Sequence, residues 1–174
     1  MQQQLLTPRP CTTGRRAISP GLLASLALEQ AGTSRPIVKK GELTMALRGA
    51  RRALGLSGPV IETLTLLISL VDPKLLETGK RPIVSPSNAF LAHSFDITGR
   101  AVQERLRIEI SAGLLLPLDG PDGKRAVRRH SDADAESYGL DLSPLVRRFP
   151  ELEQHRQTDL AAYKEGQRLR RSIS

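Results

Sequence analysis

The sequence PSNAFLAHSFDITGRAVQERLRIEISAGLLLPLDGPDGKRAVRR at residues 86–129 decides the fold. The Ser-Asn pair at 87–88 can cap a short helix over 87–94, because both side chains accept hydrogen bonds from free backbone amides. Thr98 is the next N-cap and predicts a second, longer helix over 98–112. A short helix, a tight turn and a longer helix are together typical of a helix-turn-helix motif.

The longer predicted helix has two different faces. Apolar residues recur every four positions and predict one buried stripe, made of Val102, Leu106, Ile110 and Leu114. Polar and charged residues lie on the opposite face, and these are Arg100, Glu104, Arg107 and Ser111. We expect the apolar stripe to pack on the core and the polar face to enter the major groove of a DNA duplex.

A β-hairpin is expected directly after this helix. The run 114–118 is apolar and strand-like, residues 119–123 form a dense turn signal, and 124–129 is a basic strand candidate. A helix-turn-helix followed by a positively charged hairpin indicates a winged helix. We therefore predict a mainly α fold, a winged helix-turn-helix with a helical core, a β-hairpin wing, a disordered basic N-terminal arm and a C-terminal helix.

Three helices are predicted before this motif. Ser19 followed by Pro20 marks the start of the first, because Ser is a favoured N-cap and Pro fits the first helical position. The third is apolar nearly all round and is expected at the centre of the core. The expected segments are helices over 20–31, 42–54 and 59–71, a loop over 73–82 and a short strand at 83–84.

The part of the chain after the hairpin combines acidic and basic segments. An acidic loop at 131–136 is followed by a short docking segment over 138–146 and a weakly amphipathic helix over 150–171. The sequence leaves open whether this helix pairs with another chain in a homodimer. The expected organisation is a disordered basic arm at 1–17, a winged-helix DNA-binding domain at 18–129, and a docking segment with a C-terminal helix at 130–174.

The net charge of +8 on 174 residues is unevenly placed. Residues 1–55 carry a net charge of +7, residues 56–112 are neutral, and residues 113–129 carry +2. The apolar middle is therefore neutral, and the positive charge lies on the arm and the hairpin. Because each Lys or Arg that meets a phosphate releases a counterion, this placement favours a polyanionic partner.

The composition excludes several other kinds of site. Aromatic residues make up only 3% of the chain, too few for a platform that stacks bases. The single cysteine, Cys11, excludes an internal disulfide and a zinc site with several thiolates. The three histidines are widely separated, and no glycine-rich phosphate loop is present. We therefore expect no metal, no cofactor and no enzymatic activity.

The sequence contains no segment that predicts membrane insertion or export. Residues 1–10 lack the apolar run of a signal peptide. The longest apolar stretch, 60–71, is far shorter than the roughly 20 residues that a bilayer requires. We therefore expect a soluble, cytoplasmic protein with no membrane contact.

Several motifs occur in one order that points to a known family. They are PSNA at 86–89, AGL at 112–114, PDGKR at 121–125, LDLSPL at 140–145, and upstream GRRAISPGLLASLA at 14–27 and GLSGPVIETLTLLISL at 55–70. Together they resemble the N-terminal winged-helix region of RepC, the replication initiator of repABC-type plasmids. The resemblance covers most of residues 14–150. It implies a bacterial protein, associated with a plasmid or the nucleoid, that binds an origin and initiates plasmid replication.

The sequence departs from the family pattern in the predicted recognition helix and wing. Glu104 and Glu109 stand in a helix that is usually richer in Arg, and Ala126 replaces an expected aromatic residue. The turn between the two motif helices is about one residue shorter. Such initiators continue into a separate C-terminal domain, so the resemblance implies a truncated or divergent member of the family.

The predicted DNA contacts lie on the helix-turn-helix and the wing. Polar residues at helix N-termini can bind phosphate, the polar face of the second helix can read bases, and a basic wing can bind the backbone. The predicted residues are Ser87, Asn88, Thr98, Arg100, Gln103, Arg105, Arg107, Lys124, Arg125, Arg128 and Arg129.

Two other functions remain open from the sequence. The first is a winged-helix transcription regulator that binds an operator instead of an origin. The second is a winged helix that no longer binds DNA and serves as a protein-interaction module. Glu104 and Glu109 favour the second alternative, because carboxylates on a groove-facing surface repel phosphate.

Overall fold

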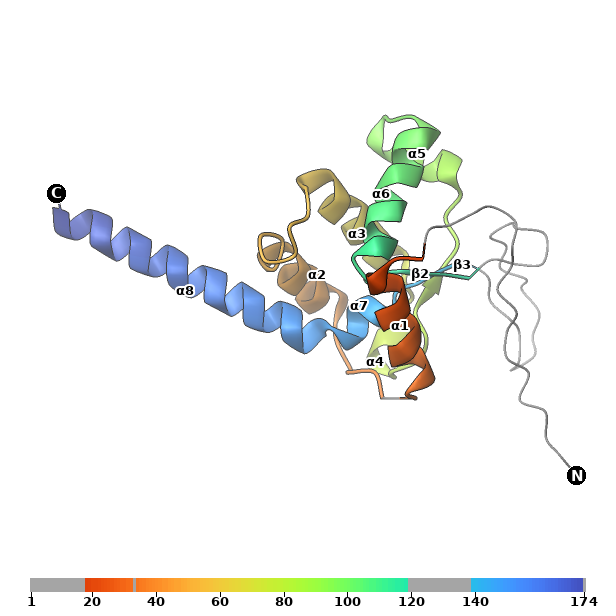
Figure 1. Ribbon diagram of the computed structural model, residues 1–174, viewed down its shortest axis with the longest axis horizontal. Coiled ribbons are helices and arrows are strands. Elements are labelled where there is room, and N and C mark those ends of the chain that lie inside the picture. The colour runs from red at the N-terminus through yellow and green to blue at the C-terminus, as the bar shows by residue number, and fades with distance from the viewer. Residues whose placement is uncertain (1–17, 33, 119–138, 174) are drawn as a thin grey trace, which may run out of the picture.

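The computed structural model describes residues 18–32, 34–118 and 139–173. A helical body surrounds a small sheet, and one long helix extends away from that body (Figure 1). The secondary structure is mainly helical with a three-stranded antiparallel sheet, which confirms the predicted fold class.

The helix-turn-helix motif lies within a helix–strand–helix–helix–strand–strand unit. Its elements are α3 (Gly58–Leu70), β1 (Ile83–Val84), α5 (Asn88–Phe95), α6 (Gly99–Ser111), β2 (Leu116–Leu118) and β3 (Gly139–Asp141). The strands lie in the order β1-β3-β2, so the last strand is the central one. This order of elements is that of a winged helix. Helix α3 packs on α6, and α5 packs on α6 as well.

The partner of β2 differs from the one expected from the sequence. Leu116 pairs with Asp141 and Leu118 with Gly139, so β2 pairs with β3, inside the segment expected only to dock. The basic strand expected at 124–129 lies outside the described residues. Strands of two or three residues are too short to show the alternation by which strands are recognised, and for this reason the docking segment was not identified as one.

The remaining helices surround the winged-helix unit. They are α1 (Pro20–Gln30), α2 (Lys40–Gly49), α4 (Pro73–Glu77), α7 (Ser143–Arg147) and α8 (Phe149–Ile173). Helices α1 and α3 agree closely with the predicted ranges, whereas α2 begins earlier and ends earlier than 42–54. The predicted loop over 73–82 is partly wrong, because it contains α4. Asp72 caps that helix by accepting a hydrogen bond from the Lys74 amide at 3.0 Å.

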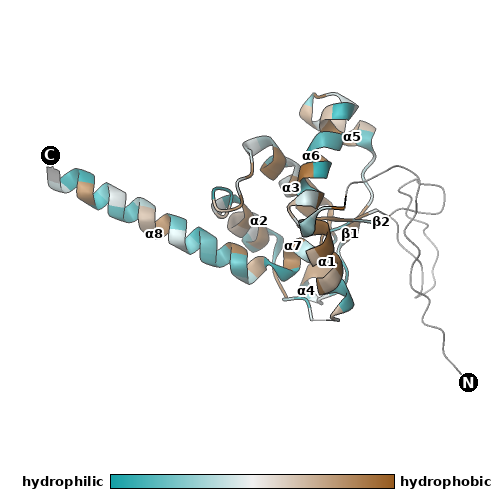
Figure 2. Ribbon diagram, in the orientation of Figure 1, coloured by the Kyte–Doolittle hydropathy of each residue, from teal (hydrophilic) through white to brown (hydrophobic). Residues whose placement is uncertain are grey.

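The core consists almost wholly of aliphatic side chains, as the low aromatic content requires. Apolar residues gather where the helices of the body meet (Figure 2). The largest fully buried side chains are Leu43, Leu47, Leu64, Leu67, Ile68, Leu76, Leu91, Leu114, Leu115, Leu140, Leu142 and Leu145. Three of the predicted stripe positions belong to this core: Val102 and Leu106 of α6, and Leu114 just after its end.

Two groups of ion pairs attach the outer segments to the sheet and to α7. Arg35 and Arg147 both donate to the Glu29 carboxylate of α1, at 2.9 and 3.0 Å. Arg81 donates to the fully buried Asp141 of β3 at 2.7 Å, and Asp141 also accepts from the Ser143 amide at 2.8 Å. Sequence patterns gave no signal for the pairs Arg147–Glu29 and Arg81–Asp141, because these partners stand far apart in the chain.

Helix α8 packs along α2 with its first half and then extends beyond the body (Figure 1). Its exposed part is predominantly polar (Figure 2). Among the described residues, no helix is both long and apolar enough to cross a lipid bilayer.

Candidate nucleic-acid interface

Each helix of the motif begins at a capping side chain. The Ser87 hydroxyl accepts a hydrogen bond from the Phe90 amide at 3.0 Å and begins α5. The Thr98 hydroxyl accepts from the Ala101 amide at 3.2 Å and begins α6. Between them Asp96 takes the left-handed conformation with φ of 51°, which Asp tolerates better than most residues. Both predicted N-caps are confirmed.

The capping hydrogen bonds do not test whether these residues also bind phosphate, so that role stays a prediction. Ser87 and Thr98 are exposed at the helix starts, where free amides and the helix dipole attract an anion. Asn88 is half-buried and already has an interaction partner. Ser87 and Asn88 stand at the N-terminus of α5, and Thr98 stands at the N-terminus of α6.

The outer face of α6 is open to solvent along its length. Arg100, Gln103, Glu104, Arg107 and Ser111 are all exposed, while Val102 and Leu106 on the opposite face are buried. The predicted division of this helix into a core face and an outer face is therefore correct for these residues. Within the described part of the chain, Arg100 and Gln103 make no hydrogen bond through their side chains.

Arg107 forms an ion pair with Glu104 on this face. Its Nε and Nη2 atoms donate to the two carboxylate oxygens of Glu104, at 3.0 and 2.6 Å. These hydrogen bonds lower the pKa of Glu104, so the carboxylate stays ionised. Both side chains are exposed, Arg107 at 70% and Glu104 at 54%.

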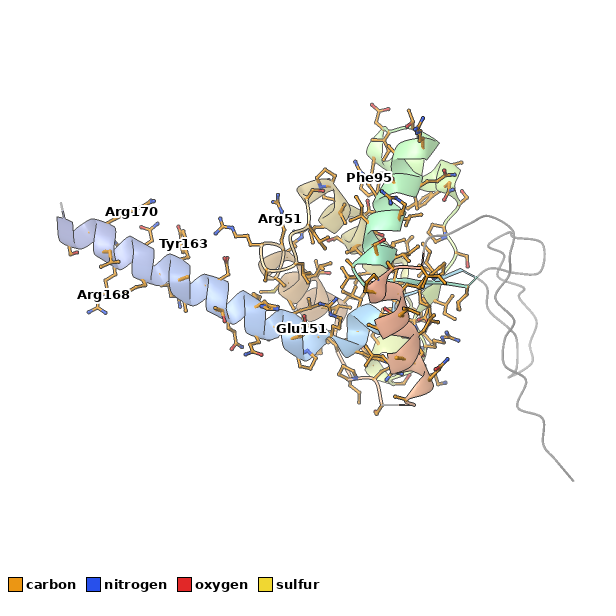
Figure 3. All side chains as sticks on the ribbon, in the orientation of Figure 1. Arg51, Phe95, Glu151, Tyr163, Arg168 and Arg170 are labelled. Carbon is orange, nitrogen blue, oxygen red and sulfur yellow. The ribbon has the colours of Figure 1, made fainter. Side chains whose placement is uncertain are left out.

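Arg105 turns away from the outer face. Its guanidinium lies 5.1 Å from the centre of the Phe95 ring, and its Nη1 atom donates to the Pro59 carbonyl and the Thr63 hydroxyl, both at 3.4 Å. Phe95 lies at the end of α5, close beside α6 (Figure 3). The structure thus places Arg105 between α6, α3 and α5, apart from the other predicted contact residues of the helix.

Glu109 lies on the buried side of α6, not among the outward charges. Its side chain has no solvent exposure, and neither carboxylate oxygen has a hydrogen-bond partner in the described structure. Burial raises the pKa of this carboxyl well above its usual value, and the positive charge of Arg105 offsets only part of that rise. The expectation that Glu109 lies on the groove-facing surface, where it would weaken DNA binding, is therefore wrong.

The predicted wing contacts Lys124, Arg125, Arg128 and Arg129 lie outside the described residues. The chain that carries them connects β2 to β3, which are neighbouring antiparallel strands. The wing of a winged helix occupies this same connection. The structure therefore assigns these four basic residues to the segment between the two strands and adds nothing on their contacts.

The other basic residues are spread over the surface. Lys40 donates to the Ser69 carbonyl at 2.7 Å, and Arg51 donates to the Leu56 carbonyl at 3.1 Å, so both help to fix the body. Arg168 and Arg170 lie on the distal part of α8, far from α6 (Figure 3). In the described ranges, no group of His, Cys, Asp and Glu side chains has the geometry of a metal site.

Comparison with known proteins gives consistent results. The family model for the replication protein C N-terminal domain matches residues 16–174. A replication protein C from Sinorhizobium fredii is 32% identical over 158 residues, which are 90% of this chain and 38% of that protein. Another from Rhizobium rhizogenes is 30% identical over 136 residues, 74% of this chain and 34% of that protein. No solved structure matches the chain.

The matched region extends from just before α1 to the end of α8, so it includes the helix-turn-helix, the wing connection and the flanking helices. The chain spans less than two fifths of the length of these two relatives. The resemblance noted in the sequence motifs is thereby confirmed by whole-chain similarity. The chain belongs to the replication protein C family and corresponds to that family's N-terminal domain.

Proposed function

We propose that this chain binds duplex DNA through its winged helix, with α6 in the major groove and the connection between β2 and β3 on the sugar-phosphate backbone. The exposed outer face of α6, opposite its buried face, is the observation that carries the proposal. Arg100, Gln103 and Arg107 stand on this face and can contact base edges or phosphates. Ser87, Asn88 and Thr98 supply helix N-termini that can bind phosphate.

Membership of the family supports an origin of plasmid replication as the DNA target and initiation of replication as the function. We propose that this chain acts by binding, without catalysis. Binding to an operator, as a transcription regulator, uses the same surfaces. A selection from plasmid fragments distinguishes the two, because an initiator enriches fragments from the origin. We further propose that the exposed half of α8 is available for a homodimer contact.

The alternative of a protein-interaction module loses part of its support. Of the two glutamates that favoured it, Glu109 is inside the core and Glu104 is neutralised by Arg107. A duplex approaching α6 therefore meets a surface whose charge is set chiefly by Arg100. The absence of binding to any duplex at low salt would nevertheless leave the protein-interaction function as the better explanation.

The wing should dominate the salt dependence of binding. Replacing Lys124→Ala and Arg125→Ala together removes two phosphate contacts, so the slope of log affinity against log salt should become shallower by roughly 2 units. Titration of a mixed-sequence duplex at several salt concentrations measures this slope. The matched control is Lys164→Ala with Arg168→Ala on α8, which removes the same charge far from α6. An equal change in both double variants would contradict a wing-specific role.

Ser87 can be tested separately as a helix cap and as a phosphate ligand. Glycine costs an N-cap only a few tenths of a kcal/mol, whereas alanine costs about 1 kcal/mol. If the hydroxyl also binds phosphate, Ser87→Gly should weaken DNA binding while leaving the thermal midpoint almost unchanged. Unchanged binding by Ser87→Gly, measured beside its unfolding curve, would restrict Ser87 to capping.

A further inference from the structure

The ion pair between Glu104 and Arg107 is the feature of the outer face that the proposed function does not yet use. On its own, an exposed carboxylate on a groove-facing helix should oppose binding to a polyanion. Here, however, the carboxylate accepts two hydrogen bonds from one guanidinium, at 3.0 and 2.6 Å. A bidentate pair of this kind fixes the plane and the direction of both groups.

The atoms used in the pair decide what remains available to DNA. Glu104 occupies one edge of the Arg107 guanidinium, formed by Nε and Nη2. The guanidinium has five N–H donors, so three remain, on Nη1 and Nη2. These form the end of the group that can donate to O6 and N7 of a guanine, the commonest specific contact in the major groove.

The carboxylate retains acceptor capacity as well. Its two oxygens offer about four lone-pair sites, of which Arg107 occupies two. In the major groove the N4 amino group of cytosine is a donor that a glutamate can accept from. Thymine and guanine offer acceptors on that edge, which a carboxylate repels, whereas adenine offers the N6 donor beside the N7 acceptor.

We propose that Glu104 is a specificity-determining residue of the DNA interface. It holds Arg107 for a guanine and itself accepts a hydrogen bond from the N4 amino group of a neighbouring cytosine. Glu104 therefore favours a G·C-containing step under α6 and disfavours thymine or guanine at the position of that cytosine by repulsion. This inference rests on the proposed DNA-binding function and assigns that function's base preference to one pair of side chains.

The test compares sequence preference with general affinity. The wild-type chain is first used to select its preferred duplexes from a randomised pool, and affinities for the selected duplex and for single-base variants are then measured. Glu104→Gln should lower the preference for G·C at one step by roughly 5- to 150-fold, the range for a lost bidentate contact. Affinity for mixed-sequence duplex should stay the same or rise. Arg107→Ala should lose guanine preference at the same step.

A matched control separates local from general charge effects. Glu165→Gln makes the same change in net charge on the distal part of α8 and should leave the preference unchanged. If Glu104→Gln raises affinity for selected and mixed duplexes by the same factor, Glu104 is only repulsive and the inference is overturned. If the wild-type chain binds no duplex at low salt, the proposed function fails and this inference fails with it. Circular dichroism of each variant checks that the helical fold is retained.

Discussion

Glu109→Leu should make the domain more stable at neutral pH, by about 1–3 kcal/mol. The wild-type carboxyl is fully buried and has no hydrogen-bond partner among the described residues, and a buried polar group left unpaired costs roughly that amount. Leucine has a similar volume and removes the polar atoms altogether. Urea unfolding followed by circular dichroism measures the free energy of unfolding. A loss of stability in Glu109→Leu would show that the carboxyl has a stabilising partner.

The same residue should make stability depend on pH. Burial raises the pKa of Glu109 in the folded chain above its unfolded value, so the folded state binds more protons between these two values. The contribution of this group to the free energy of unfolding is largest below the pKa of the unfolded chain, near 4.5. It is lost as the pH rises towards the raised pKa of the folded chain. Glu109→Leu and Glu109→Gln should both abolish this slope. Glu165→Gln, an exposed substitution on α8, should retain it.

Sequence periodicity failed at Glu109 for a geometric reason. The predicted stripe used a spacing of exactly four residues from Val102 to Ile110, yet a helix turns once every 3.6 residues. A residue seven positions after Val102 therefore lies within about 20° of it, whereas one eight positions later is rotated by about 80°. Glu109 therefore lies on the same helix face as Val102 and is buried. Ile110 is rotated away from that face and is only half-buried.

The parts of the fold that local signals specify were predicted well. Ser19, Ser87 and Thr98 each cap a helix as expected, because an N-cap needs only its own side chain and an amide two or three residues later. Helix α4 was missed although its cap was present. The sequence predicts a loop over 73–82, yet Asp72 caps a helix that begins at Pro73.

The contacts of the candidate site depend on tertiary structure and were harder to predict. The outer face of α6 follows from helical spacing alone, which is why Arg100, Glu104 and Arg107 were placed correctly on the surface. The orientation of Arg105 depends on Phe95 and on the Pro59 carbonyl of α3. Neither contact has a signal in the local sequence, so only the packed structure separates Arg105 from its neighbours.

The crossing of α1 over the end of α6 depends on two glycines. Gly113 ends α6 in the left-handed conformation, with φ of 68°, and its amide and the next one donate to the Ile110 and Glu109 carbonyls. Gly21 of α1 lies directly against this turn. Nearby, the buried Ser25 hydroxyl donates to the Gly21 carbonyl at 3.0 Å. The backbones of the two helices therefore approach each other with no side chain between them.

Gly21→Ala should consequently lower the free energy of unfolding by about 1–3 kcal/mol, the usual cost of overpacking. Its methyl group would collide with the Ser111 carbonyl oxygen and stand 2.7 Å from the Gly113 amide nitrogen, both of them backbone atoms that cannot rotate away. Gly166→Ala in α8 is the matched control, because nothing lies within 4 Å of its added carbon. That control should gain up to about 1 kcal/mol from helix propensity. Equal effects of the two substitutions in urea unfolding would show that α1 does not depend on close contact with α6. Loss of stability in Gly21→Ala alone shows that this close contact helps to hold α1 beside the candidate recognition helix.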